Sequence, residues 1–325
     1  MMHSRRQFLH YAPMVAAAPM FISRANADTY PTRAVRVIVP FAPGGQTDVV
    51  ARLVAQKLSE RLGKQFFIEN VAGAGSSIGV GRAAQATPDG YTVLFVDGIS
   101  FVTNPLLQNN VPYHPITDFA PVITAATTMQ VLAVHPSVPA NNVQELIALI
   151  KANPGKYSYA SAGTGTGSHL TGELFRSELN LDVVHVPYGG GGPAIGAALA
   201  GHTPISFGSP AATIPQHKEG KLRALAVGGR IRLRGLPDVP TFIEMGYKNI
   251  ECDAVVGVLV PIRSPKEIIG VLHREIDAVV ATTEVRERFT ELGFETVRSS
   301  PDELSAFFKS DIVRWTKVIH GMQAK

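Results

Sequence analysis

The sequence contains one cysteine, Cys252, among 325 residues. An intramolecular disulfide framework and a multi-cysteine metal site are therefore excluded. A lone cysteine can be reactive, but a small buried hydrophobic residue is its commoner role. Aromatic residues make up only 7% of the chain and are scattered, so the stacking platform of a protein that binds single-stranded nucleic acid is not expected.

Two motifs of common catalytic and nucleotide-binding sites are also missing. The sequence has neither a G-x-x-x-x-G-K-[ST] loop nor an H-E-x-x-H helix. Ser168 and His169 are adjacent and leave one alternative open, a hydrolase that uses this pair. No carboxylate partner for the histidine is evident in the sequence, however. We therefore expect a protein that is not an enzyme and that binds neither a cofactor nor a metal ion.

Residues 1–27 have the composition of an export signal. Arg5-Arg6 opens a short basic region, an apolar stretch covers residues 11–22, and Ala25-Asn26-Ala27 fits a small-x-small cleavage site. The apolar stretch is too short to span a bilayer as a helix. The paired arginines resemble a bacterial twin-arginine signal, and the alternative is an ordinary secretory signal. Both interpretations predict a mature chain that begins at Asp28 and lies outside the cytoplasm.

Removing this segment changes the charge of the protein. The full chain has 30 basic and 26 acidic residues, which gives a formal net charge of +4. Three of the basic residues, Arg5, Arg6 and Arg24, and none of the acidic ones lie in residues 1–27, which leaves 27 against 26. A nearly neutral chain without a lysine and arginine cluster lacks the electrostatic footprint of a nucleic-acid-binding protein.

The rest of the chain alternates short β-branched runs with helical segments, which is typical of an α/β architecture. Strands are predicted over residues 35–39, 66–68, 92–96, 131–134, 157–159, 183–186, 204–207, 222–227 and 255–260. Helices are predicted to begin near Thr47 or Asp48, at Asn141 or Asn142, near Leu170 and near Ala194.

Two further helices are predicted near the C-terminus from their start signals. Ser264-Pro265-Lys266-Glu267 and Ser300-Pro301-Asp302-Glu303 both fit a capping box with proline at the first helical position. Three glycines are expected to end helices: Gly63, Gly293 and Gly321.

Two lobes that exchange the chain directly through strands are the natural interpretation, because no long linker and no repeat of fixed period occurs. We expect residues 1–27 to be the signal, 28–128 the first part of lobe 1, 129–228 lobe 2, and 229–325 the return to lobe 1 with the C-terminal helices.

Two glycine-rich loops join a strand to a helix in the same way. Residues 40–48 follow the first strand, and residues 160–169 follow a strand in the second unit. Glycines let backbone N–H groups approach a ligand, and the N-terminus of the next helix adds unpaired donors and a partial positive charge. Hydroxyl groups that can add to each loop are those of Thr47, Ser161, Thr164 and Thr166. Two such loops across a cleft suit a ligand with one or two carboxylates, whereas the alternative is that each is only a tight connection.

Other segments fit the same cleft less distinctly. Residues 73–79 form a close-packed turn that helps to shape the cleft. Residues 188–193 either line it or are only a loop. His169 is expected to contact the ligand or to be satisfied within the protein, and His185 is expected to be structural.

Short motifs spread along nearly the whole mature chain are specific to one family. They are Tyr30-Pro31, Val39-Pro40-Phe41-Ala42-Pro43-Gly44-Gly45 with Thr47-Asp48, Pro88-Asp89-Gly90-Tyr91-Thr92, Asp118-Phe119-Ala120-Pro121-Val122, Ala160-Ser161-Ala162-Gly163, His185-Val186-Pro187-Tyr188, Gly220-Lys221-Leu222-Arg223-Ala224-Leu225-Ala226-Val227, Leu236-Pro237-Asp238-Val239-Pro240-Thr241 and Pro301-Asp302-Glu303. By these motifs the sequence resembles the Bug family (TctC-like) of periplasmic solute receptors, which serve tripartite tricarboxylate transporters.

The resemblance implies a two-lobed periplasmic-binding-protein fold, type II-like, with a ligand cleft between the lobes. The cleft would close around a small mono-, di- or aromatic carboxylate. The protein, which we expect to be a monomer, would deliver this ligand to the large and small membrane permease subunits of the transporter. A periplasmic sensory receptor for the same ligands is the alternative, since its fold and site would be the same.

The resemblance also implies that the ligand contacts come largely from the backbone and hydroxyl groups of the two loops. With the loops themselves, it gives these candidate ligand-binding residues: Phe41, Gly44, Gly45, Thr47, Asp48, Ser161, Ala162, Thr164, Gly165, Thr166, His169, Tyr188, Gly189 and Ser209. The sequence departs from the family at three places. Many relatives have an aspartate at the position of Gly208, Arg-Pro is common in place of Val71-Ala72, and the residue at the position of Gln46 is often small. The missing acid at position 208 argues against a ligand that needs an ammonium partner there.

Overall fold

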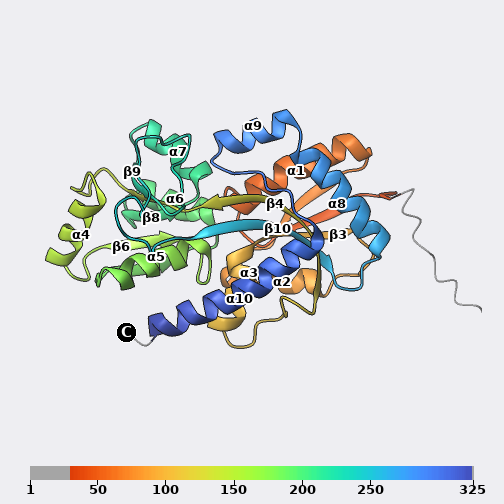
Figure 1. The fold of residues 1–325 in the computed structure, drawn as a ribbon, viewed down its shortest axis with the longest axis horizontal. Helices are drawn as coiled ribbons and strands as arrows, with labels where there is room; N and C mark the ends of the chain where they lie inside the picture. The colour runs from red at the N-terminus through yellow and green to blue at the C-terminus, as the bar shows by residue number, and fades with distance from the viewer. Residues whose placement is uncertain (1–29, 324–325) are drawn as a thin grey trace, which may run out of the picture.

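The computed structural model describes residues 30–323 as two five-stranded sheets, one in each half of an elongated molecule (Figure 1). In spatial order, the first sheet consists of β2 (Phe66–Asn70), β1 (Val35–Val39), β3 (Thr92–Asp97), β10 (Asp253–Pro261) and β4 (Phe119–Met129). The second consists of β7 (Val184–Pro187), β6 (Ser158–Ser161), β8 (Ile205–Gly208), β5 (Val131–Val134) and β9 (Arg223–Val227). This confirms the predicted α/β class with two lobes. The predicted export signal lies outside the described residues.

Both sheets have the same topology. In the first, β1 runs parallel to β2 and β3, while β10 lies antiparallel between β3 and β4. In the second, β6 runs parallel to β7 and β8, while β5 lies antiparallel between β8 and β9. Strands β1 and β6 therefore hold equivalent positions, and ligands of open α/β sheets bind at the carboxyl ends of such strands, where the strand order reverses.

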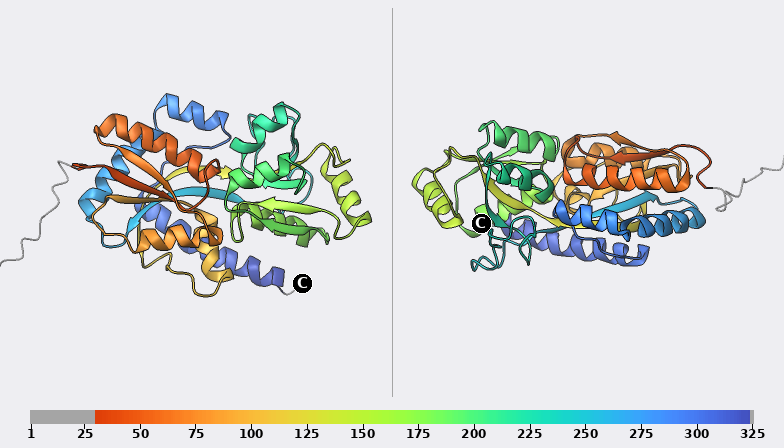
Figure 2. Two further views of the ribbon diagram at one scale, coloured as in Figure 1. Left: turned by 180° about the vertical axis from the view of Figure 1, so that it is seen from behind. Right: turned by 90° about the horizontal axis from the view of Figure 1, so that it is seen from above.

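Helices cover both faces of the first sheet (Figures 1 and 2). One face packs against α1 (Gln46–Leu62), α8 (Lys266–Val280) and α9 (Thr283–Glu291), and the other packs against α2 (Ser77–Ala84), α3 (Gly98–Leu107) and α10 (Pro301–Gln323). The second lobe carries α4 (Val143–Ala152), α5 (Gly167–Glu178), α6 (Gly191–Leu199) and α7 (Pro210–Lys218). A short 3-10 turn, η2 (Ala74–Ser76), precedes α2.

Two strand connections join the lobes. Strand β4 leads into β5 with Gln130 between them, and the chain returns along β10, which pairs with β4 (Figure 2). Residues 229–252, which were predicted to return to lobe 1, pack instead on the second lobe. The Phe242 backbone N–H donates to Val227 O at 3.0 Å, and its ring centroid lies 6.0 Å from that of Phe175. The first sheet resumes only at Asp253.

The structure confirms several predicted helix ends. The backbone of Gly63 is left-handed after α1, as a C-terminal glycine requires, and Asn142 caps α4 by accepting from Glu145 N. The predicted stop at Gly321 is wrong, because α10 continues through that residue to Gln323. Helices α2, α3 and α7 and strand β4 were not predicted as such.

The two predicted capping boxes differ. Ser300 Oγ accepts from Glu303 N at 3.2 Å, and Glu303 Oε2 accepts from Ser300 N at 2.7 Å, so this capping box is confirmed. The prediction at Ser264 is wrong: α8 begins at Lys266 after Pro265, and the buried Ser264 Oγ has no hydrogen-bond partner.

This difference predicts opposite outcomes for one substitution. Ser300→Ala is expected to lower the free energy of unfolding by about 1 kcal/mol, the usual cost of losing a cap. Ser264→Ala, the matched control, removes an unpaired buried hydroxyl and should leave stability unchanged or slightly raise it. Urea denaturation of both variants measures the difference, and equal losses would contradict this assignment of the caps.

Within residues 30–323, no helix has the length and apolar character needed to cross a membrane.

Candidate ligand-binding site

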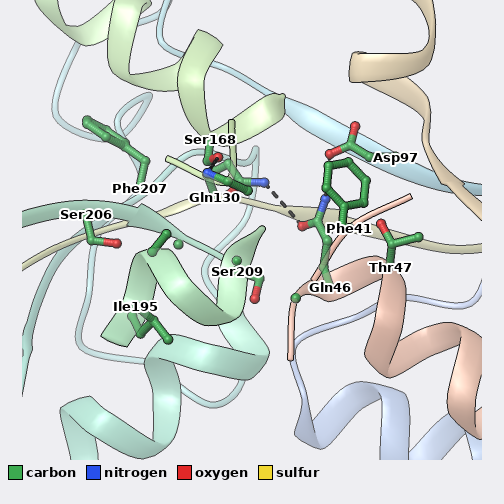
Figure 3. A pocket seen from close by; sticks show the side chains of 15 residues that line it. Phe41, Gln46, Thr47, Asp97, Gln130, Ser168, Ile195, Ser206, Phe207 and Ser209 are labelled. Atoms are coloured by element: carbon green, nitrogen blue, oxygen red, sulfur yellow. Dashed lines mark hydrogen bonds between the residues drawn. The ribbon is translucent and has the colours of Figure 1, made fainter. Parts of the chain in front are cut away.

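A pocket lies between the two lobes at the carboxyl ends of the equivalent strands (Figure 3). We call it the inner pocket. It is lined by Phe41, Gly45, Gln46, Thr47 and Asp97 of lobe 1, by Gln130 between the lobes, and by Ala162, Ser168, Gly191, Ala194, Ile195, Ser206, Phe207, Gly208 and Ser209 of lobe 2. The free volume is about 30 Å³, so the space suits a chemical group the size of a carboxylate rather than a long molecule.

The N-termini of helices converge on this pocket from both lobes. Gly45 and Ser209, which line the pocket, are the N-cap residues of α1 and α7, and Gly191 is the first residue of α6. None of these three helices has a side-chain cap, so the first backbone N–H groups of α1 and α6 remain available to a ligand. Helix α7 begins with Pro210, which has no N–H, and Ala212 N donates to Ser209 O, so its first turn offers the N–H of Ala211. The aligned peptide dipoles give each N-terminus a partial positive charge. Among the lining residues only Asp97 is ionisable, so any anion in this pocket would be held by neutral donors.

Asp48 holds the first loop from within lobe 1 rather than facing the pocket. Its Oδ2 accepts from Gly44 N at 3.0 Å and from Arg52 Nε at 2.8 Å, and its Oδ1 accepts from Asn70 Nδ2 at 2.8 Å. The same Asn70 amide donates to Phe41 O at 2.9 Å. Burial raises the pKa of Asp48, but the bonds from Arg52, Asn70 and Gly44 outweigh it and the net pKa is lowered. The carboxylate therefore stays charged and fixes the loop.

Hydroxyl groups hold the second loop in a similar way. Thr166 Oγ1 donates to Gly163 O at 2.6 Å and accepts from His169 N, which makes it the cap of α5. Ser168 Oγ accepts from Ala162 N at 2.9 Å. Ser161 Oγ lies 2.6 Å from His185 Nε2. The loop is thus positioned before any ligand arrives.

The geometry gives no support to a hydrolase that uses Ser168 and His169. His169 Nδ1 accepts from Gly165 N at 3.1 Å, while Ser168 Oγ is engaged by Ala162 N and Thr166 Oγ1. Burial lowers the pKa of His169, so the ring is neutral. The residues 75–79 have the letters of a G-x-S-x-G motif, but Ser77 Oγ is bonded to Gln108 Oε1 at 3.4 Å and not to a histidine.

A chain of polar side chains runs along the inner pocket from the connection between the lobes into lobe 1 (Figure 3). Gln130 Nε2 donates to Gln46 Oε1 at 3.3 Å, and Gln46 Nε2 donates to Asp97 Oδ2 at 3.0 Å. Asp97 Oδ1 caps α3 by accepting from Ile99 N and Ser100 N. Sequence reasoning missed all three side chains as pocket residues. For Asp97 a signal was available, since it is the last residue of a buried strand next to β1.

A second, wider space adjoins the inner pocket, and we call it the outer chamber. It shares Phe41 and Ala162 with the inner pocket and has a volume of about 430 Å³. Its other lining residues are Gly73, Ala74, Gly75, Ser76, Gln108, Gly163, Thr164, Pro187, Tyr188 and Gly189. The turn at residues 73–79 and the loop at residues 188–193 therefore both contribute to the cleft.

The two lobes touch through glycine backbone at the edge of the cleft. The Ala42 N–H donates to Gly189 O at 3.0 Å. A Cβ atom added to Gly192 would lie 2.2 Å from Pro43 O, and one added to Gly75 would lie 2.1 Å from Thr164 O. Such close approach is possible only without side chains, so the structure is a closed arrangement of the lobes.

The predicted site residues thus fall into three groups. Those at the inner pocket are Phe41, Gly45, Thr47, Ala162 and Ser209; those only at the outer chamber are Thr164, Tyr188 and Gly189; those that line neither space are Gly44, Asp48, Ser161, Gly165, Thr166 and His169. Over residues 30–323, no group of three or more histidine, cysteine, aspartate or glutamate side chains is placed to hold a metal ion.

Residues 50–323 match the family described as the tripartite tricarboxylate transporter family receptor, TctC. The chain belongs to the TctC family. Protein BugT of Bordetella pertussis is 34% identical to this chain over 319 residues, which are 96% of this chain and 98% of BugT.

Solved structures of TctC-type proteins share the fold. The periplasmic binding protein BugD is 34% identical, with a TM-score of 0.88 over 90% of this chain and 99% of BugD. The R. palustris protein Rpa4515, solved with adipate, is 32% identical, with a TM-score of 0.88 over 90% of this chain and 98% of that one. MatC from Rhodopseudomonas palustris, solved with bound malate, is 30% identical, with a TM-score of 0.85 over 89% and 100%. The predicted periplasmic-binding-protein fold and the resemblance to the Bug receptors are confirmed.

Proposed function

We propose that this TctC receptor captures a small carboxylate in the periplasm and presents it to the large and small permease subunits of a tripartite transporter, without catalysing a reaction. The observation that carries the proposal is the convergence of three uncapped helix N-termini on a pocket without cationic side chains. Such a site stabilises an anion through backbone donors. The adipate and malate bound by two structural neighbours support a carboxylate as the anion.

The two spaces suggest how such a ligand lies. One carboxylate group occupies the inner pocket, between the first loop with Gly45 and Thr47 and the start of α6 and α7. The rest of the molecule extends past Phe41 and Ala162 into the outer chamber, because the inner pocket is too small for it. The predicted residues that line neither space then act by holding the two loops in position.

Each lobe contributes different loops to the ligand-binding cleft. We place the boundaries at Gln130 and near Asp253, where the chain passes between the two sheets. Lobe 1 contributes the loop after β1, and lobe 2 contributes the loops after β6 and β8. A ligand that contacts both lobes stabilises the closed arrangement by its differential affinity for it.

The Thr47 hydroxyl provides a direct test. Its Oγ1 is buried at the inner pocket and has no partner in the protein, so a ligand carboxylate is its natural acceptor. Thr47→Val keeps the shape and removes the donor. We expect its affinity for adipate or malate to fall about 10-fold, as for a hydrogen bond to a charged group, with little change in melting temperature.

Thr213 offers the matched control. Its Oγ1 is also buried and unpartnered, but the residue does not line the inner pocket. Thr213→Val should bind the same ligands as tightly as the wild type in isothermal titration calorimetry. If none of a panel of short mono- and dicarboxylates binds the wild-type protein, or if both variants lose affinity equally, the proposed site is wrong.

A further inference from the structure

The inner pocket contains an acid where an anion is expected to bind. Asp97 is 4% exposed and is the one ionisable side chain among the lining residues. It lies at the carboxyl end of β3 and lines the inner pocket together with Phe41 and Thr47 (Figure 3). A ligand carboxylate in this pocket and an ionised Asp97 would be two like charges in a desolvated space, where both cannot stay ionised without a large cost.

The partners of Asp97 do not neutralise it. The groups that bond it are backbone N–H groups and the amide of Gln46, all of them neutral. Burial raises its pKa to about 6, and hydrogen bonds from Ser100, Ile99, Gly167 and Gln46 only partly offset the effect. An anion bound nearby would raise this pKa further.

No titratable group described on the surrounding elements is placed to neutralise Asp97 or to hold a proton beside the ligand carboxylate in its place. On α1, Asp48 is paired with Arg52. On α5, His169 has a lowered pKa because of its burial. Before β10, the Cys252 thiol stays protonated because burial raises its pKa to about 12. Asp253 of β10 has a pKa that is raised by burial and by Glu251, and it is influenced by Arg230 and Arg314 rather than by a pocket residue.

The polar chain along the inner pocket fits either state of Asp97. When the carboxyl group is ionised, it accepts from Gln46 Nε2 as observed. When it is protonated, rotation of the Gln46 and Gln130 amides by half a turn each lets Asp97 donate to Gln46 Oε1 and lets Gln46 Nε2 donate to the Gln130 side-chain oxygen. A proton on Asp97 therefore breaks no contact of the closed lobes.

We propose that Asp97 sets the form of acid that the inner pocket accepts: the ligand binds together with one proton, which is held between its carboxylate and Asp97. The inference rests on the proposed function. It makes Asp97 a specificity-determining residue, because the affinity for a fully ionised ligand then depends on the uptake of a proton from solution. The class of ligand is then a weak carboxylic acid bound with a net charge one unit more positive than that of its free anion.

Calorimetry at pH 8, in two buffers with different enthalpies of ionisation, measures the proton directly. With adipate and malate as probes, we expect uptake of about one proton per ligand at pH 8 and almost none at pH 5, where Asp97 is already protonated. Affinity should fall close to 10-fold between pH 7 and pH 8, as expected when one proton must be bound.

Asp97→Asn should bind the probes with no proton uptake and with an affinity that does not change between pH 6 and pH 8. Asparagine is also a good helix N-cap, so α3 keeps its start. Asp311→Asn on α10 is the control, since Asp311 is 4% exposed but does not line the pocket, and it should keep the wild-type pH dependence.

Wild-type binding at pH 8 without proton uptake, or uptake that persists in Asp97→Asn, would overturn the role of Asp97 and leave the carboxylate-binding function standing. A failure of all probes to bind even at pH 5 would instead show that the proposed function itself is wrong.

Discussion

Replacing Gly192 by alanine is expected to weaken carboxylate binding about 100-fold, while the unliganded protein stays folded and at least as stable. The added Cβ would lie 2.2 Å from Pro43 O of the other lobe, and a backbone oxygen cannot be moved as easily as a flexible side chain. Overpacking of this kind costs about 1–3 kcal/mol, and we expect the upper end. The cost falls on the closed state alone, because Gly192 lies within α6 and alanine suits a helix.

Gly196 of the same helix gives the matched control. A Cβ at Gly196 meets nothing within 4 Å, so Gly196→Ala should leave binding unchanged and raise the free energy of unfolding by about 0.5–1 kcal/mol. Calorimetry with adipate or malate reports binding, and small-angle scattering reports whether the ligand still closes the lobes. Wild-type affinity in Gly192→Ala would show that the closed contact at Pro43 is not required for binding.

Replacing Asp48 by alanine is expected to lower the free energy of unfolding by about 3 kcal/mol and to abolish measurable binding. The substitution leaves the donors of Gly44 and Asn70 and the charge of Arg52 without their acceptor, and the loss of a buried acceptor is costly. The first loop would then lose the contact that sets its shape. Urea denaturation and calorimetry on the same preparation measure both effects.

The pH dependence of Asp48→Ala checks the cause. Because the folded-state pKa of Asp48 is lowered, its contribution should be complete above about pH 4, the unfolded value, and should be lost as the pH falls through the lower folded value. Glu60→Ala, on the exposed part of the same helix, should barely change stability, since Glu60 makes a surface ion pair with Lys57. A difference between wild type and Asp48→Ala that does not shrink as the pH falls below about 4 would point to another cause.

Sequence patterns predicted those elements that have one buried side. Helix α1 shows a single apolar stripe and ends at Gly63, so its period and its stop were both visible. Helix α3 was missed because seven of its ten residues are buried, including Ser100, Thr103 and Asn104, so polar and apolar positions do not alternate with the helical period. It also contains Pro105, which usually marks the end of a helix.

The loops of the candidate site were predictable from the sequence, but the polar side chains Gln46 and Gln130 of the inner pocket were not. The glycine and hydroxyl residues before α1 and α5 can be recognised in the sequence, because a tight turn before a helix needs such residues. Gln46 and Gln130 carry no such signal, since an amide side chain at a helix start or between strands is common on any surface. Their meeting depends on how the start of α1 lies against the end of β4, a contact between residues 84 positions apart that the local sequence does not reveal.

Helix α10 gives the molecule a mechanical property. It packs against α3 and β4 in one lobe and reaches α5 in the other (Figure 1). Trp315 and Ile319 are nearly fully buried and belong to the same hydrophobic cluster as Leu174 and Phe175 of α5. An opening rotation that separates α5 from α10 would expose this apolar surface to water, which costs free energy. The same free energy favours closure when the surface is buried again. We therefore expect the lobes to open by a small angle only and at an energetic cost, rather than to rotate freely about a flexible hinge.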